Sequence, residues 1–205
     1  MDEIGLFPLE LVLLPTERVA LHIFEPRYRE LISECLQESR EFGVVLQLDD
    51  GIAETGTRAA VARVLQILDD GRMNIVVEGR ERFRVAEVTS GRSFITAQVE
   101  PVTDEADEPD HETVERALAL FSRLIDATES AAELPDPAGE QLSFDLAARI
   151  DFAVDVKQEL LELRSPRLRV ERTIELVEEA LEEIRADTET QRRASGNGKV
   201  TPLGD

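Results

Sequence analysis

The residues best suited to chemistry are two histidines and one cysteine. His22 stands in an apolar run three residues before Glu25, and His111 stands in an acidic stretch. A histidine with a carboxylate and a nucleophile would suit a hydrolase. Cys35, however, falls on the apolar face of a predicted helix, where cysteine behaves as a small buried hydrophobe. A lone histidine in a strand usually satisfies a local hydrogen bond, so the sequence predicts no catalytic residue.

Motifs that would bring a cofactor or a metal are missing from the sequence. No G-x-x-x-x-G-K-[ST] run is present to cradle phosphates, and no G-x-S-x-G nucleophile elbow occurs. No two histidines stand at the helical spacing of a zinc site. The acidic run at 103–112 lacks the glycine and the ordered ligand spacing of a calcium loop. We therefore expect a protein that is not an enzyme and holds no metal and no cofactor.

Composition and charge narrow the class of protein. The 205 residues are 42% hydrophobic and 33% charged, as in soluble globular chains. The net charge is −21, which repels phosphate backbones and argues against nucleic acid as a partner. No apolar run approaches the ~18 residues of a membrane span, and the acidic start Met-Asp-Glu is unlike a secretory signal. The single cysteine allows no intrachain disulfide. We expect a cytoplasmic protein with no membrane partner.

The first hundred residues read as strands around one helix. Short apolar or alternating runs predict strands at 11–14, 19–24, 42–48, 61–68, 73–78, 82–88 and 94–99. Pro26 suits the first turn of a helix, and Tyr28, Leu31, Ile32 and Cys35 then repeat at helical spacing. Asp70-Gly71 between two β-rich runs predicts a hairpin, because glycine readily adopts the positive φ of the turn.

The second half reads as helices. Asp110 is the expected N-cap of the first helix, and 142–152 reads as the second. Asp155 with Gln158 resembles a capping box at the start of a third. Ser165-Pro166 combines a capping hydroxyl with a proline at the first helical position. A seam at spacings of four and three residues then predicts packing on a neighbouring helix; it comprises Val170, Ile174, Val177, Leu181 and Ile184.

These patterns give the expected domain limits. Residues 1–102 form a β-rich domain, 103–110 an acidic linker, 111–187 a helical bundle and 188–205 a disordered tail without apolar periodicity. Strands followed by helices indicate an α+β fold.

Several motifs, in order, resemble the Lon substrate-binding domain, the N-terminal domain of Lon proteases. They are Phe7-Pro8-Leu9, His22-Ile23-Phe24-Glu25-Pro26-Arg27-Tyr28, Phe42-Gly43-Val44-Val45, Gly79 with Arg82-Phe83, and Lys157-Gln158-Glu159-Leu160-Leu161-Glu162 followed by Arg169 and Glu171-Arg172. The resemblance implies a PUA-like β pseudo-barrel with one helix, followed by a C-terminal helical bundle. It also implies a module that binds proteins without catalysis.

The candidate peptide-binding residues lie near the predicted start of the first helix. Aromatic side chains are expected mainly in the core, with one or two lining an apolar groove. Glu25 is expected to face the positive end of the helix dipole, with the rim of a peptide-binding surface as the alternative. The candidates are Phe7, His22, Phe24, Glu25, Arg27 and Tyr28.

Three functions stay open at this point. The favoured one is a module that binds exposed apolar segments of unfolded or partly folded client proteins. The second is an adaptor or regulator that delivers clients to a separate protease or chaperone. The third, an enzyme or RNA binder on the same barrel, is opposed by the net charge and the missing catalytic groups. A homo-oligomer is compatible with each.

Overall fold

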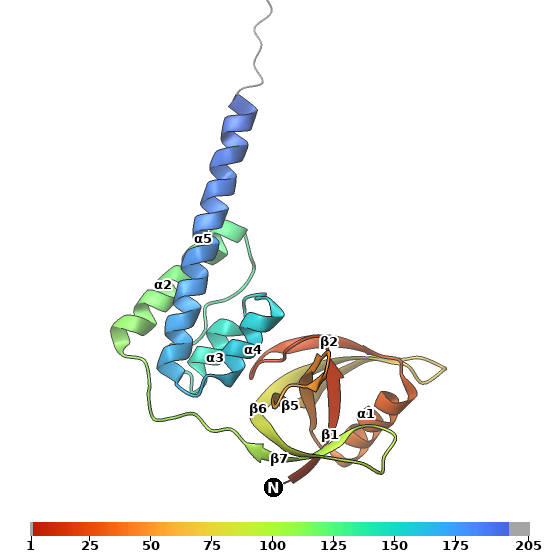
Figure 1. Ribbon diagram of the computed structural model, residues 1–205. Helices are drawn as coiled ribbons and strands as arrows, with labels where there is room; N and C mark the ends of the chain where they lie inside the picture. Colours follow the sequence, from red (N-terminus) through yellow and green to blue (C-terminus); the bar gives the residue numbers. More distant parts are fainter. Residues whose placement is uncertain (1, 197–205) are drawn as a thin grey trace, which may run out of the picture.

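A β-barrel and a helical bundle lie side by side in the computed structural model, which describes residues 2–196 (Figure 1). The barrel contains strands β1 (Asp2–Leu9), β2 (Arg18–Ile23), β3 (Phe42–Leu48), β4 (Gly51–Ile52), β5 (Thr55–Ile67), β6 (Met73–Thr89) and β7 (Thr96–Pro101), with helix α1 (Pro26–Glu38). The bundle contains α2 (His111–Thr128), α3 (Leu142–Ala147), α4 (Val154–Glu162) and α5 (Pro166–Gly196). The expected α+β fold class is confirmed.

Five strands close into a barrel. Their order is β1-β7-β6-β5-β3, and β3 returns to β1 through a parallel pairing that sets Leu6 opposite Gly43. The other pairings in this ring are antiparallel. Because the ring is closed, each of these strands has a neighbour on both sides along its paired residues, and those residues form no open edge.

Strand β6 belongs to two parts of the sheet. Its C-terminal half, from Phe83 on, pairs with β7, whereas its first residues, Met73–Glu78, pair with β2. The expected strands at 73–78 and 82–88 are thus one continuous strand. Along Met73–Glu78, the strands β2, β6 and β5 form a three-stranded sheet, which we call the wing. Its β5–β6 turn is the predicted hairpin, with Gly71 at a φ of 81°.

Helix α1 supplies much of the barrel core. It starts at Pro26 as expected, and its buried residues are the predicted Tyr28, Leu31, Ile32 and Cys35. They pack with Phe7, Leu13, Phe42 and the inward side chains of the wing in one apolar cluster. A Cβ on Gly5 would lie 2.3 Å from Leu31 Cδ1, so any larger residue on β1 at this position would force the Leu31 side chain to move.

The strand expected at 11–14 is not formed, which corrects the sequence reading. Val12, Leu13 and Leu14 are all buried, because this segment packs between two apolar clusters, one in the barrel and one beside the helices. Leu13 packs into the barrel, whereas Val12 and Leu14 pack against the helices. Side chains satisfy its backbone: Thr57 Oγ1 donates to the Leu13 carbonyl at 2.6 Å, in place of a neighbouring strand.

The bundle is built around the pairing of α2 with α5. The seam of Val170, Ile174, Val177 and Leu181 is buried against α2, as expected. Asp110 caps α2 by accepting from the Thr113 amide at 2.8 Å. At the start of α5, Ser165 Oγ accepts from the Leu168 amide at 3.0 Å.

Three expectations for the helical part were wrong. The capping box at Asp155 and Gln158 does not form: the N-cap of α4 is Ala153, two residues earlier than expected, and Gln158 instead donates to the Thr55 carbonyl at 3.3 Å. The second helix ends at Ala147, before the expected 152. The expected disordered tail at 188–205 conflicts with the structure over 188–196, where α5 continues. Alanine, arginine and glutamine favour helix there. Residues 197–205 lie outside the described part.

The acidic segment at 103–110 is fastened to the bundle. Asp107 accepts from Ser165 Oγ at 2.6 Å and from Arg167 Nε at 3.1 Å. These side-chain hydrogen bonds, first from Ser165 and then from Arg167, lower the pKa of Asp107 below its usual 3.8.

We predict that Asp107→Asn makes the free energy of unfolding less dependent on pH under acidic conditions. A carboxylate whose pKa is lowered by folding contributes stability in full above its unfolded pKa, and this contribution is lost as pH falls through its folded pKa. The free energy of unfolding of the unaltered chain should therefore drop more steeply below about pH 4 than that of the variant. Urea titrations at several pH values measure this. Glu108→Gln, an exposed neighbour, is the control and should keep the steeper drop.

Candidate protein-interaction site

The junction between β2 and α1 carries two exposed rings. Phe24 is 60% exposed, and its ring stacks on that of His22 with centroids 5.9 Å apart. His22 Nδ1 lies 2.6 Å from Asn74 Oδ1, and Asn74 Nδ2 donates to Gln66 Oε1 at 3.4 Å. Polar side chains thus cross the outer face of the wing from β2 to β5. The expectation that His22 makes a local hydrogen bond fits this contact. Phe24 departs from the expectation that the aromatic side chains lie mainly in the core, and its exposure is compatible with its place among the candidate peptide-binding residues.

Glu25 and Arg27 form a partly exposed pair beside Phe24. Arg27 Nε donates to Glu25 Oε2 at 2.9 Å, and the guanidinium lies 4.5 Å from the centroid of the Tyr28 ring. The Glu25 side chain makes no capping hydrogen bond to α1, although its backbone occupies the N-cap position. Glu25 thus stands at the N-terminal end of α1, as expected, and its carboxylate is paired with Arg27 and makes no cap hydrogen bond.

Phe7 and Tyr28 lie inside the barrel. Their ring centroids are 4.1 Å apart, both residues are buried, and burial raises the pKa of the Tyr28 hydroxyl. Among the six candidate residues, the structure therefore brings His22, Phe24, Glu25 and Arg27 to the surface. Phe7 and Tyr28 support that surface from below.

The wing exposes further apolar residues that the sequence reading did not single out as a surface. Val64, Leu65 and Ile67 near the end of β5 are all exposed. Ile67 pairs with Met73, which pairs with Ile23. The sequence showed an apolar run here, and such a run predicts a strand without telling whether its neighbours cover it.

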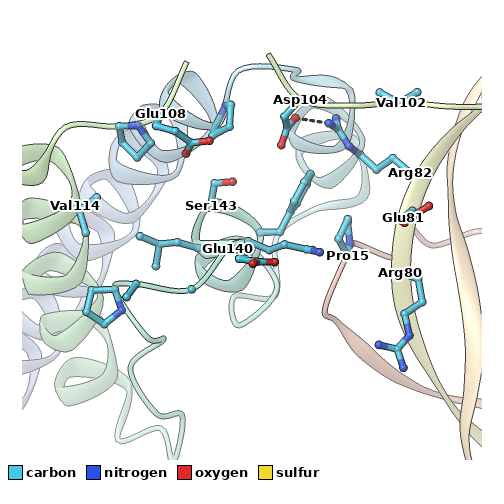
Figure 2. A pocket seen from close by; sticks show the side chains of 18 residues that line it. Pro15, Arg80, Glu81, Arg82, Val102, Asp104, Glu108, Val114, Glu140 and Ser143 are labelled. Carbon is cyan, nitrogen blue, oxygen red and sulfur yellow. Dashed lines mark hydrogen bonds and ion pairs between the residues drawn. The ribbon is translucent and has the colours of Figure 1, made fainter. Parts of the chain in front are cut away.

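A cleft of about 380 Å³ separates the barrel from the bundle (Figure 2). Arg82 of β6 enters its wall, and its side chain is only 3% exposed. It donates to the carbonyls of Leu161 and Leu163 at 2.7 and 2.8 Å and pairs with Asp104. Burial, and then the charge of nearby Arg169, lower the pKa of Arg82 to about 10, which leaves it charged at neutral pH.

Arg169 of α5 completes this cluster. It is fully buried and donates to Asp104 Oδ1 at 2.7 Å and to Ser143 Oγ at 2.6 Å. The ring of Phe144 lies 3.6 Å from the Arg169 guanidinium and 5.1 Å from that of Arg82, as in cation–π contacts. One carboxylate thus joins two cations from separate parts of the fold.

A second ionic contact crosses the same junction. Lys157 Nζ lies 2.5 Å from Glu17 Oε1, with both side chains largely buried. Glu17 Oε2 also accepts from the Leu14 amide at 2.9 Å. Around these contacts, Val12 and Leu14 pack with the apolar side chains of α3 and α4. The barrel and the bundle therefore meet in an apolar cluster to which both contribute.

Two potential nucleophiles, Ser143 in the cleft and Cys35 in the barrel, occupy structural positions. Ser143 in the cleft accepts from Arg169 and so lies beside a cation and not beside a general base. Cys35 is buried, and burial raises its pKa to about 11, which disfavours the reactive thiolate. Within residues 2–196, no three metal-binding side chains gather. Over the same range, no helix has the length and apolar character to cross a membrane.

The barrel joined to a bundle is the architecture that the sequence resemblance implied. The family described as "ATP-dependent protease La (LON) substrate-binding domain" matches residues 3–179. The chain therefore belongs to the Lon substrate-binding domain family.

Relatives and solved structures agree with this membership. The chain is 28% identical to the Lon protease of Anaeromyxobacter dehalogenans and 27% identical to Lon protease 2 of Myxococcus xanthus, each over 187 residues and 83% of this chain. It spans 22% and 23% of the length of those relatives. The Lon N-terminal domain protein from Xanthomonas campestris matches with a TM-score of 0.66 at 28% identity, covering 84% of this chain and 96% of that one. The N-terminal domain of Mycobacterium avium complex Lon protease, at 17% identity with a TM-score of 0.66 over 86% of this chain and 98% of its own, supports the fold.

We predict that Arg82→Met lowers the free energy of unfolding by about 2 kcal/mol, because the buried Leu161 carbonyl loses the hydrogen bond from Arg82 and an unsatisfied buried acceptor costs about 1–3 kcal/mol. Urea denaturation followed by circular dichroism measures the change. Arg84→Met is the matched control: Arg84 lies on the same strand but is exposed and paired with Glu100, so its loss should cost less than about 1 kcal/mol. Equal losses in the two variants would contradict the role given to Arg82.

Proposed function

We propose that this chain is a non-catalytic module that binds exposed apolar segments of unfolded or partly folded client proteins in the cytoplasm. The main support is its membership of a substrate-binding family across residues 3–179. The exposed apolar residues of the wing and of the β2–α1 junction supply a surface for such binding. The net charge of −21 favours polypeptide partners over nucleic acid.

Binding would rest on burial of apolar surface around Phe24. Covering an exposed aromatic side chain contributes about 1.5–3 kcal/mol, and the stacked His22 ring holds Phe24 in place. Glu25 and Arg27 would form a polar rim. A surface of this kind selects for apolar character and not for one sequence, so we expect loose specificity among clients.

We predict that Phe24→Ser weakens client binding about ten-fold, which corresponds to about 1.4 kcal/mol. A chemically reduced and alkylated protein that cannot fold serves as client, labelled for fluorescence anisotropy, with its folded form as the negative probe. Leu134→Ser is the matched control, because Leu134 is also exposed but lies in the loop before α3. Failure of the unaltered chain to prefer the unfolded over the folded form would overturn the proposed function.

A second function, an adaptor that delivers clients to a separate protease or chaperone, is favoured by the shape of α5. This helix extends well beyond the other helices (Figure 1), and its buried residues in the bundle core end at Leu181. The projecting part would be the docking element.

Shortening the chain after Asp187 tests the adaptor function. Client binding should persist, while co-purification of a protease or chaperone from cells should be lost. Retention of the same companion by the shortened chain would count against the adaptor.

A further inference from the structure

One edge of the wing is open. Strand β3 pairs with β5 only from Thr57 to Ala59, although β5 continues to Ile67. Beyond Ala59, β6 is the sole strand partner of β5 in the described part of the chain. An edge strand presents N–H and C=O groups that are ready to pair with another extended chain.

Two rows of apolar side chains cross the wing and end at this edge in exposed residues. One row runs from Ile23 through Met73 to Ile67, with exposed fractions of 1%, 3% and 62%. The parallel row, from Leu21 through Ile75 to Val64, also ends exposed at β5. A further strand on β5 would extend both rows, since side chains of paired residues lie on the same face.

A hollow marks the place where such a strand would begin. It measures about 520 Å³ and is lined in part by Leu36 and Cys35 of α1 and by Ala60 and Val61 of β5. It lies where the pairing between β3 and β5 stops, so an added segment would continue the position of β3 along β5.

We infer that the free edge of β5, from Ala60 to Ile67, binds an extended apolar segment of a client by strand addition. This inference rests on the proposed function and names its binding surface and mode. Main-chain hydrogen bonds would provide affinity, and alternate apolar side chains would continue the two rows. The one charged residue in this stretch is Arg63, so an uncharged or weakly acidic segment suits the edge.

A second copy of the chain is a poorer occupant of this edge. Each copy has a net charge of −21, which opposes association of two copies. The pairing of β5 with β6 is also irregular between Val61 and Arg63 and between Val64 and Gln66. Such bulges twist an edge away from flat pairing with its equal, whereas a flexible segment can follow the twist.

The test uses a labelled, capped ten-residue peptide in which valine and threonine alternate around one glutamate. A second peptide of the same sequence carries N-methyl groups on alternate amides, which removes donors without removing apolar side chains. Anisotropy titrations compare the unaltered chain with Val64→Thr/Ile67→Thr, which keeps β-branched residues and hence strand propensity. Val88→Thr is the matched control, because Val88 is exposed on β6 away from this edge.

The inference predicts that the double substitution and the N-methylated peptide each weaken binding about ten-fold or more, while Val88→Thr stays within about two-fold, a difference of about 0.4 kcal/mol. Equal binding by the unaltered chain and Val64→Thr/Ile67→Thr would overturn the edge assignment, as would equal binding of the two peptides. The proposed function would survive both results if the unfolded client still bound. Sedimentation that shows a dimer, lost in the double variant, would assign the edge to a second copy and also overturn the inference.

Discussion

The cluster of Arg82, Asp104 and Arg169 holds this protein together. It joins β6, the acidic segment and α5 through a single carboxylate, and it satisfies three carbonyls at the C-terminal end of α4. Two buried cations close together repel each other, so the arrangement is stable only because Asp104, those carbonyls and the Phe144 ring offset the charge. The barrel and bundle are therefore coupled by a polar centre inside an apolar junction.

The position of this cluster on β6 explains which surface of the barrel remains exposed to solvent. Arg82, near the middle of β6, donates to carbonyls at the end of α4, whereas the turn between β5 and β6 lies on the side of the barrel away from the helices (Figure 1). Contacts with the bundle thus lie near the middle of β6, and they leave Phe24 and Ile67, beside the start of this strand, exposed. Ile67 of β5 pairs with Met73, and Phe24 directly follows Ile23, the residue of β2 that pairs with Met73 on its other side.

Local patterns predicted most of the elements, and long-range packing decided the rest. Proline at 26, glycine at 71 and the cap at Asp110 each act within a few residues, so sequence spacing was enough to place them. The apolar run at 11–14 was wrongly predicted to be a strand, because its burial comes from packing between the barrel and the helices and not from pairing in a sheet. Aromatic character favours burial without ensuring a neighbour, so the sequence could not tell which of the candidate aromatics, Phe7, Phe24 and Tyr28, would be exposed. The roles of Arg82 and Arg169 were missed, since arginines separated by 87 positions carry no local sign of sharing one carboxylate.

The length of helix α5 determines how far from the barrel its C-terminal end lies. Its 31 residues rise about 1.5 Å each, yet the seam that fixes it to α2 ends at Leu181. The remaining turns form a rigid spacer of roughly 20 Å. A partner bound at the end of this helix would therefore be held at a fixed distance and orientation from the barrel. Lengthening or shortening the helix by one residue would rotate that partner by about 100° around the helix axis.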